Sequence, residues 1–188
     1  WTIVNMPPDN HCGFHSIIYG LRSSPIQIDP NMLNLNDTDK NLVLKLRFML
    51  IEHYQENLNE KYKEIINDPD YWLEDEDLSY FAEKFKICFC VYDQAADRLR
   101  NRVYDPNLGK QRSATKEERR ALRETLNVFT NITPFGESCN FFIYLYQKGN
   151  HYDVMFPKNY EYNTQAKVPK RIKISERSEE HTSELQSP

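Results

Sequence analysis

A cysteine near the start of the chain stands where a catalytic nucleophile could work. Cys12 follows the turn-forming residues Asp9, Asn10 and His11 and opens the apolar run GFHSIIYGL at 13–21. A thiol attacks as the thiolate, and the positive end of a helix dipole lowers the thiol pKa. The loop before such a helix can direct backbone N–H groups at an oxyanion, and Asn10 suits a turn that needs a positive φ. These four residues therefore predict a nucleophile with its oxyanion loop.

A candidate base and its orienting carboxylate lie far downstream, in the apolar run HYDVMF at 151–156. A cysteine nucleophile needs a base that takes its proton, and the base needs a third group that orients it. Side chains alternate along a strand, so His151 and Asp153 project to the same side, where the carboxylate can fix the imidazole tautomer. We therefore expect Cys12, His151 and Asp153 to form a catalytic triad, with His151 as the general base.

Simpler interpretations exist for each of these residues. A lone cysteine is often a small buried hydrophobe, His151 alone could be a surface histidine, and Asp153 could be a solvated acid at a strand end. His11, Cys12 and His15 could also bind a metal, but no second cluster has the spacing of zinc ligands. We expect no metal and no cofactor, because a thiol, an imidazole and a carboxylate need neither.

The composition limits the class of protein. The chain has 188 residues, of which 39% are hydrophobic and 13% aromatic, and a formal net charge of −4. This length favours one domain, which we place over residues 1–176 with a core at about 5–158. The sequence has no basic stripe, so we expect no nucleic-acid partner. No apolar run approaches the roughly 18 residues of a membrane span, so we expect no membrane association.

The four cysteines lack the dense spacing of a disulfide scaffold. The first residues, WTIVNMPP, also lack the basic and apolar parts of a signal peptide. We therefore expect free thiols and a cytoplasmic location. Cys88 and Cys90 belong to one apolar strand and are expected to pack in the core, and Cys139 has no evident partner.

The two ends of the chain carry no signal for the fold. Residues 177–188 resemble the translated frame of a sequencing-library adapter, so we exclude them and give His181 no role. The first residue is Trp1 and not Met, so we expect a domain taken from a larger polypeptide. We expect this domain to be monomeric.

The hydrophobic pattern predicts an α+β fold, in which a small antiparallel or mixed sheet packs on helices. Apolar residues at intervals of three and four indicate helices, and short apolar runs between turn residues indicate strands. Acids at the start of one helical pattern suit the positive end of its dipole. In chain order we expect a short helix from Cys12 to about 21, a helical block over 40–66 with a break near 57–59, a helix over 74–85, a strand over 87–92, a surface helix over 116–126, a short strand near Val128, strands over 140–146 and 151–156, and a peripheral segment from Pro157.

Three motifs together resemble those of the ovarian-tumour (OTU) family of cysteine proteases. Residues 9–17, DNHCGFHSI, resemble the nucleophile motif, with an Asp three before the Cys and a Phe two after it. Trp72 and Asp77 resemble the middle motif, in which a Leu and then a strand follow the acid. Residues 140–153 resemble the closing motif, which is an apolar strand, a turn with Gly and then His-Tyr-Asp. The motifs occur in the order of the family, and the His-Ser-Ile of the first is similar to viral and mobile-element members.

The resemblance implies a papain-like OTU fold, with a small central sheet between helices and the nucleophile at a helix N-terminus. It implies that Cys12 attacks, that His151 is first base and then acid, and that Asp153 orients His151. Asp9 would hold the oxyanion loop, and the middle Trp and acid would be mainly structural. The substrates implied are conjugates of ubiquitin or a ubiquitin-like protein, cleaved by a deubiquitinase that acts as an isopeptidase.

Two positions depart from the family pattern, and two other functions stay open. Asn10 stands where the family usually has Gly, and Gly13 stands where it has a bulkier residue. Asn can reach the left-handed region, and Gly in a first helical turn costs up to ~1 kcal/mol, so neither change removes a reacting group. The chain could instead be a catalytically silent module that binds ubiquitin, or a viral protease that processes its own polyprotein.

Overall fold

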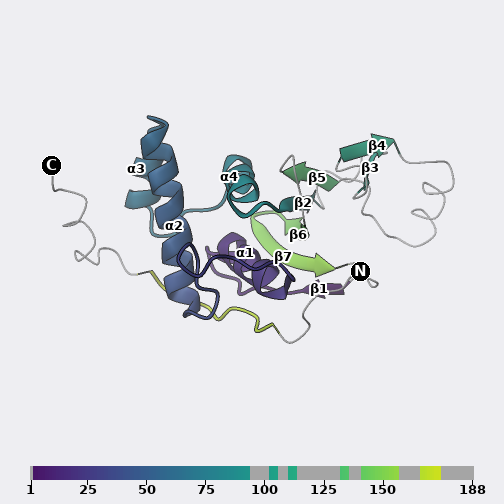
Figure 1. Ribbon diagram of the computed structural model, residues 1–188, viewed down its shortest axis with the longest axis horizontal. Coiled ribbons are helices and arrows are strands. Elements are labelled where there is room, and N and C mark those ends of the chain that lie inside the picture. Colours follow the sequence, from purple (N-terminus) through teal and green to yellow (C-terminus); the bar gives the residue numbers. More distant parts are fainter. Residues whose placement is uncertain are drawn as a thin grey trace.

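The computed structural model describes residues 2–93, 102–105, 110–113, 132–135, 141–156 and 166–174. Over these residues four helices and seven strands form a mixed α and β fold, consistent with the α+β class (Figure 1). In chain order the elements are β1 (Thr2–Val4), α1 (Cys12–Ser23), α2 (Asp39–Glu56), α3 (Lys61–Asn67), α4 (Asp75–Phe85), β2 (Cys88–Asp93), β3 (Arg102–Asp105), β4 (Lys110–Ser113), β5 (Ile132–Phe135), β6 (Phe142–Lys148) and β7 (His151–Phe156).

Five of the strands form one mixed sheet in the order β1-β7-β6-β2-β5. β2 runs parallel to β6, and the other neighbours are antiparallel. A tight turn joins β6 to β7, and its Gly149 has a φ of 60°, which glycine adopts without a steric cost. The register of this hairpin places His151 opposite Lys148. His151 therefore begins β7 next to the turn. β3 and β4 pair with each other in a separate two-stranded sheet.

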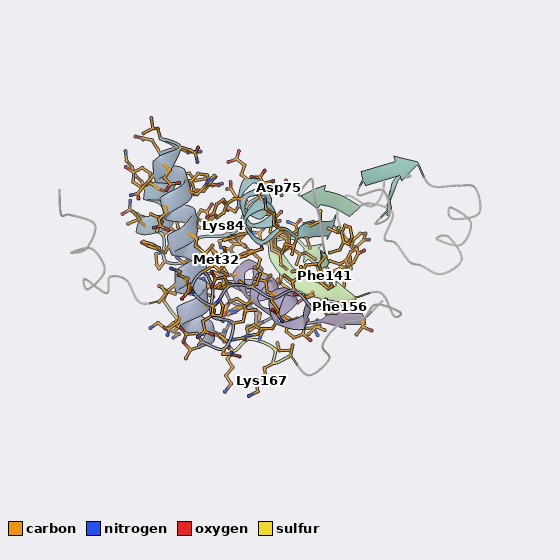
Figure 2. The ribbon with its side chains drawn as sticks, viewed as in Figure 1. Met32, Asp75, Lys84, Phe141, Phe156 and Lys167 are labelled. Carbon is orange, nitrogen blue, oxygen red and sulfur yellow. The ribbon has the colours of Figure 1, made fainter. Side chains whose placement is uncertain are left out.

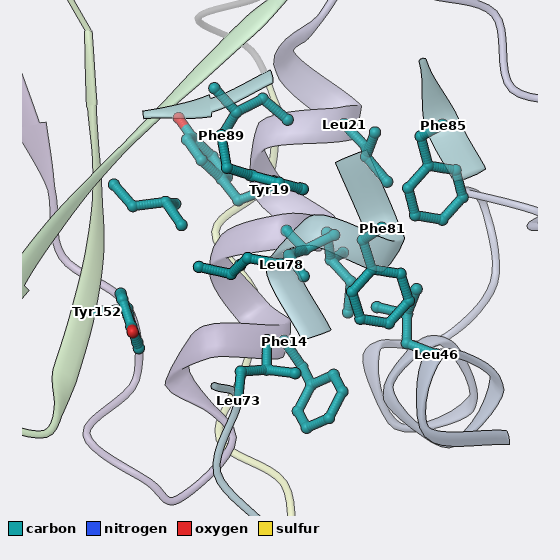
Figure 3. Close-up of a cluster of buried hydrophobic side chains, with 14 of the residues drawn as sticks. Phe14, Tyr19, Leu21, Leu46, Leu73, Leu78, Phe81, Phe85, Phe89 and Tyr152 are labelled. Carbon is teal, nitrogen blue, oxygen red and sulfur yellow. The ribbon is translucent and has the colours of Figure 1, made fainter. Parts of the chain in front are cut away.

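The main core lies between the helices and one face of the large sheet. Figure 3 shows part of it: Phe14 and Tyr19 come from α1, Leu46 from α2, Phe81 from α4 and Phe89 from β2. All five side chains are buried, and burying one such side chain stabilises a fold by ~1.5–3 kcal/mol. The core therefore fixes α1 against the strands that carry the candidate base.

A glycine in α1 sets how closely this helix approaches the sheet. A Cβ added at Gly20 would lie 2.6 Å from Cγ2 of Ile143 in β6. Real Cβ atoms do not come so close to another carbon, because interiors are already packed at the density of organic crystals. The absence of a side chain at Gly20 thus lets α1 lie directly on β6.

Capping residues explain where two of the helices begin. Thr38 precedes α2, and its side chain accepts a hydrogen bond from the Asn41 N–H at 3.2 Å. Glu74 precedes α4 and forms a capping box with Asp77, in which each side chain accepts from the other residue's main chain. Such pairs satisfy N–H groups that have no partner within the helix. α4 ends at Phe85, and the next residue, Lys86, is left-handed with a φ of 56°.

A buried carboxylate anchors the segment before α4. Asp77 is fully buried and accepts hydrogen bonds from the Tyr71 hydroxyl at 2.8 Å, from the Glu74 N–H at 2.8 Å and from the Tyr54 hydroxyl. Lys61 Nζ lies 3.4 Å from its Oδ1. Burial raises the pKa of both tyrosines, and Asp77 raises it further, so both hydroxyls stay protonated and donate. The acid of the middle motif is therefore a structural anchor.

The aromatic residue of the middle motif has a different environment. Trp72 is 37% exposed, although its neighbours Tyr71 and Leu73 are buried. Arg47 fixes the preceding turn, because its guanidinium donates to the carbonyls of Ile65 and Asp68 at 2.6 Å each. Trp72 therefore lies partly at the surface, next to this turn.

Most of the expected elements are present. The short helix from Cys12, the broken helical block, the acid-led helix and the strands on the three apolar runs correspond to α1, α2 with α3, α4, β2, β6 and β7. The break lies at Leu58, which has a φ of 54°. β1, β3, β4 and β5 were not expected, because runs of three or four residues are too short to show an alternation. The helix expected over 116–126, the strand near Val128 and the tail at 177–188 lie outside the described residues.

Part of the chain after β7 contacts the core. We call residues 166–174 the C-terminal strap. Ala166, Ile172 and Ile174 of the strap pack against the main core, and the Lys170 N–H donates to Asp39 Oδ2 at 2.8 Å. The segment expected to be peripheral therefore lies on the surface in the strap, with three partly buried side chains against the core.

In the parts of the chain that the structure describes, no helix combines the length and apolar character needed to cross a membrane.

Candidate active site

The sulfur of Cys12 lies against the start of β7. Cys12 is the first residue of α1. Its Sγ accepts a hydrogen bond from the Tyr152 N–H at 3.4 Å, and its thiol donates to the Asn150 carbonyl at 3.7 Å. Ser16, one turn further along α1, donates to the Tyr152 carbonyl at 3.3 Å. The N-terminal turns of α1 therefore hold the main chain of β7 on both sides of His151.

His151 and Asp153 form a pair on β7. His151 Nε2 lies 2.9 Å from Asp153 Oδ1, and the same oxygen accepts from the Met6 N–H at 2.7 Å. An ionised carboxylate can only accept, so Nε2 carries the proton and Nδ1 is left as the acceptor. The Asp153 side chain is largely buried, whereas the His151 side chain is 31% exposed. This is the arrangement in which a carboxylate fixes the tautomer of an imidazole base.

The structure pairs His151 with Asp153 and places the Cys12 sulfur against the main chain beside His151. Among the described residues, no hydrogen bond joins Cys12 Sγ to the His151 ring, and the thiol donates to the Asn150 carbonyl. Both main-chain partners of the sulfur are immediate neighbours of His151 in sequence. Apo sites often hold their catalytic bonds open in this way until substrate binds.

The pKa of the Cys12 thiol is raised. Cys12 is only 1% exposed, and this burial raises its pKa above the ordinary value of 9.0. The N–H groups of Tyr152 and Gly13 act in the opposite direction, and the charges of Asp9 and Asp153 raise the pKa further. The expectation that the helix N-terminus lowers this pKa is therefore wrong for this arrangement, because desolvation outweighs the N–H groups.

Asp9 fixes the loop before Cys12. Its Oδ1 accepts from the His11 N–H at 2.9 Å, and its Oδ2 lies 3.1 Å from His15 Nε2. Its carbonyl accepts from the Cys12 N–H at 3.3 Å. His15 is fully buried, and burial lowers its pKa, so its ring is neutral and Nε2–H is the donor. Asp9 therefore closes the loop through the His11 N–H and joins the loop to the first turn of α1 through His15.

The oxyanion loop has one main-chain donor to spare. The His11 N–H is already bonded to Asp9, whereas within the described ranges the Asn10 N–H has no partner. Among the described residues other than glycine, positive φ angles occur only at Leu58 and Lys86. The positive φ expected at Asn10 is therefore wrong. The bond from His11 to the Asp9 carboxylate closes the turn, and this kind of turn does not need that conformation.

Gly13, which departs from the family pattern, faces a large side chain. A Cβ at Gly13 would lie 3.0 Å from Cδ1 of Leu73 and 3.1 Å from its Cβ. Figure 3 shows Leu73 next to the first turn of α1 and Phe14. Leu73 therefore occupies the space that a bulkier residue at position 13 would need. Its side chain packs against the first turn of α1.

Sequence reasoning missed the main-chain partners of the site. The Asn150 carbonyl and the N–H groups of Tyr152 and Met6 bind the triad residues. Main-chain groups are the same at every residue except proline, so the sequence holds no signal for them. His15 was singled out as a possible metal ligand and is instead a partner of Asp9. In the regions that the structure describes, no three His, Cys, Asp or Glu side chains are grouped to hold a metal.

The cysteines differ in oxidation state. Cys88 is disulfide-bonded, whereas Cys12 and Cys90 are free thiols. Cys88 and Cys90 are both buried, as expected for β2. The expectation of free thiols is therefore wrong for Cys88.

Comparison with known proteins assigns no family. No protein-family model matches the chain, and no curated protein matches its sequence. Function therefore has to be inferred from the residues of the site and their geometry.

Proposed function

We propose that the protein is a thiol hydrolase that cleaves ubiquitin, or a ubiquitin-like protein, from its conjugates. One observation carries the proposal: the Cys12 sulfur, at the N-terminus of α1, binds the main chain on both sides of His151, whose ring is paired with Asp153. The three motifs that resemble the OTU family support a papain-like OTU fold and a modifier as the substrate.

Each residue of the site has a role in this reaction. His151 takes the thiol proton on Nδ1, and the Asp153 carboxylate stabilises the imidazolium because it accepts from Nε2. The Cys12 thiolate attacks the carbonyl carbon at the C-terminus of the modifier. As the isopeptide C–N bond breaks, His151 returns the proton to the lysine nitrogen, which leaves as an amine. Water then attacks the thioester with His151 as base, which releases the carboxylate and restores the thiol.

The loop before Cys12 stabilises the charge that develops on the attacked oxygen. The Asn10 N–H is the main-chain donor that Asp9 leaves free, and the long bond of the Cys12 N–H to Asp9 can be exchanged for one to the oxyanion. One donor to an oxyanion is worth ~10²–10³ in rate. Asp9 contributes by holding the loop in this shape.

Substrate binding also has to expose the thiol. In the structure Cys12 is buried and bonded to the Asn150 carbonyl. Entry of the modifier's C-terminus displaces this carbonyl, which frees the thiol proton for His151. The raised pKa of the thiol then matters less, because the proton passes directly to a base.

A ubiquitin suicide probe, which carries an electrophile at its C-terminus, tests the proposal. Wild type should form one covalent adduct, and Cys12→Ala should form none. Cys90→Ala is the matched control, since Cys90 is the other free thiol among the described residues and is also buried; it should react as wild type does. The proposal fails if wild type does not react, or if Cys12→Ala reacts. Probes built on ubiquitin-like proteins tell whether the modifier is ubiquitin.

The burial of Cys12 favours one second candidate, a silent module that binds the modifier. A thiol that is 1% exposed and donates to a carbonyl is not ready to attack. Calorimetric titration of ubiquitin into the intact protein, with a parallel assay of hydrolysis, distinguishes the two functions. Binding without turnover supports the silent module, and turnover that requires Cys12 excludes it.

A further inference from the structure

The C-terminal strap reaches the loop before Cys12. The Ile172 N–H donates to Asp9 Oδ2 at 3.2 Å, and the guanidinium of Arg171 donates to the Pro8 carbonyl at 2.9 Å. Figure 1 shows the strap in yellow, passing beneath α1 and the lower end of α2. Two consecutive strap residues therefore hold two consecutive residues of the loop, more than 160 positions away in sequence.

The strap is itself fixed to the body of the protein. Pro169 is buried, and the Lys170 N–H donates to Asp39 Oδ2 at 2.8 Å, at the first residue of α2. The other oxygen of Asp39 pairs with Arg22 in the last turn of α1 at 2.7 Å. Lys167, in contrast, points away from the protein (Figure 2). The strap is thus anchored to α1 and α2 before it reaches the loop.

The bonds of the Asp9 carboxylate make the strap part of the site. Oδ1 accepts from the His11 N–H, within the loop. Oδ2 accepts from two partners outside it, His15 on α1 and Ile172 on the strap. The direction of the carboxylate is therefore set by α1 and the strap together, and the direction of the carboxylate sets the turn at His11.

We propose that the C-terminal strap is a positioning element of the catalytic site, which acts through the Ile172 N–H on Asp9 and so on the oxyanion loop. The inference rests on the proposed thiol hydrolase. It extends the catalytic unit beyond the strand that carries His151, to Ile174. It also gives His15 a role, as the second donor that orients Asp9.

Two proline substitutions in the strap test the proposal. Ile172→Pro removes the N–H that Asp9 accepts. The matched control Lys167→Pro changes an exposed strap residue whose side chain points away from the protein. With a fluorogenic ubiquitin substrate, Ile172→Pro should lower kcat by ~10-fold and leave KM within ~2-fold, less than the loss of a whole oxyanion donor. Lys167→Pro should keep kcat within ~2-fold of wild type, since Lys167 does not hold the loop.

A spectroscopic signal keeps this test separate from that of the proposed function. The Nε2–H of buried His15 gives a proton resonance that reports its bond to Asp9, with or without turnover. This resonance should shift in Ile172→Pro and stay in place in Lys167→Pro. His15→Gln, which retains a donor near the position of Nε2, should retain more kcat than His15→Ala.

The results that overturn the inference are specific. The strap does not position Asp9 if the His15 resonance is unchanged in Ile172→Pro, or if both proline variants lose kcat only in proportion to their loss of thermal stability. If Ile172→Pro does not fold, Arg171→Ala replaces it, with Lys173→Ala as control, because Arg171 holds Pro8. An inactive wild type refutes the proposed function, and the His15 resonance still decides whether the strap holds the loop.

Discussion

Substitution of Asp153 separates two tasks of one carboxylate oxygen. Oδ1 lies 2.9 Å from His151 Nε2 and accepts from the Met6 N–H at 2.7 Å. Asp153→Asn retains an oxygen that can accept from both donors, but it loses the negative charge. Asp153→Ala removes the acceptor altogether and leaves the buried Met6 N–H without a partner. The two variants should therefore differ in both activity and stability.

The expected losses of kcat and of the free energy of unfolding follow from these contacts. A hydrogen bond to a charged acceptor exceeds a neutral one by about 1 kcal/mol, so Asp153→Asn should lower kcat by ~5- to 10-fold. Asp153→Ala loses the orientation of the base, and we expect kcat to fall by ~10²–10³. An unsatisfied buried N–H costs ~1–3 kcal/mol, so Asp153→Ala should also lower the free energy of unfolding by that amount.

The assay is the hydrolysis of a fluorogenic ubiquitin C-terminal amide, with urea unfolding of the same samples. Asp75→Asn and Asp75→Ala are the matched control pair, because Asp75 lies on α4, away from β7 (Figure 2); both should keep the kcat of wild type. Equal losses for Asp153→Asn and Asp153→Ala, or full activity of Asp153→Ala, would refute the view that Oδ1 orients His151.

Three further predictions concern the burial of the site and its supports. Iodoacetamide should alkylate Cys12 slowly at neutral pH and faster as the pH rises, with an apparent pKa above 9.0, because burial disfavours the thiolate. Mass spectrometry of the Cys12 peptide measures the rate of alkylation, and a midpoint below pH 8 would show that burial does not raise the pKa of this thiol. Asp77→Ala leaves several buried donors without an acceptor, so the free energy of unfolding in urea should fall by ~3–5 kcal/mol. A fall of less than 1 kcal/mol would show that these hydrogen bonds do not anchor α4. Gly13→Ala should destabilise the protein by ~1 kcal/mol, because overpacking against Leu73 exceeds the gain in helix propensity. In a Leu73→Ala background the same change should become stabilising, and no change of sign would mean that Leu73 is not the obstacle.

The periodic parts of the fold could be predicted from the sequence. The helical spacing over 40–66 and 74–85 corresponds to α2 with α3 and to α4, and the three short apolar runs correspond to β2, β6 and β7. Burial of one face is visible in the order of the residues. The start of a helix at Cys12 and the pairing of His151 with Asp153 were predictable too, since the turn before Cys12 and the strand alternation indicate them. These features depend on side-chain identity, which the sequence states directly.

The remaining features depend on partners that the sequence does not name. The bonds of Cys12 to Asn150 and Tyr152 and of Asp9 to Ile172 use main-chain groups. The raised pKa of the Cys12 thiol depends on how completely the fold excludes water from it, and sequence position alone does not give that. The disulfide at Cys88 depends on a three-dimensional distance between two cysteines.

The pairing of Met6 with Asp153 gives β1 a role beyond closing the sheet. β1 is an edge strand that pairs with β7 at Thr2, Ile3 and Val4, and its first two residues are exposed. Short exposed edges open locally at a much lower free energy than the whole fold. If local opening of β1 extends to Met6, two residues beyond its end, Asp153 loses the Met6 amide. In the proposed thiol hydrolase, the fraction of molecules that are competent for catalysis would then follow this local unfolding equilibrium. Hydrogen exchange at the Met6 amide would measure that fraction, and a ligand that binds β1 would change the activity of the proposed hydrolase.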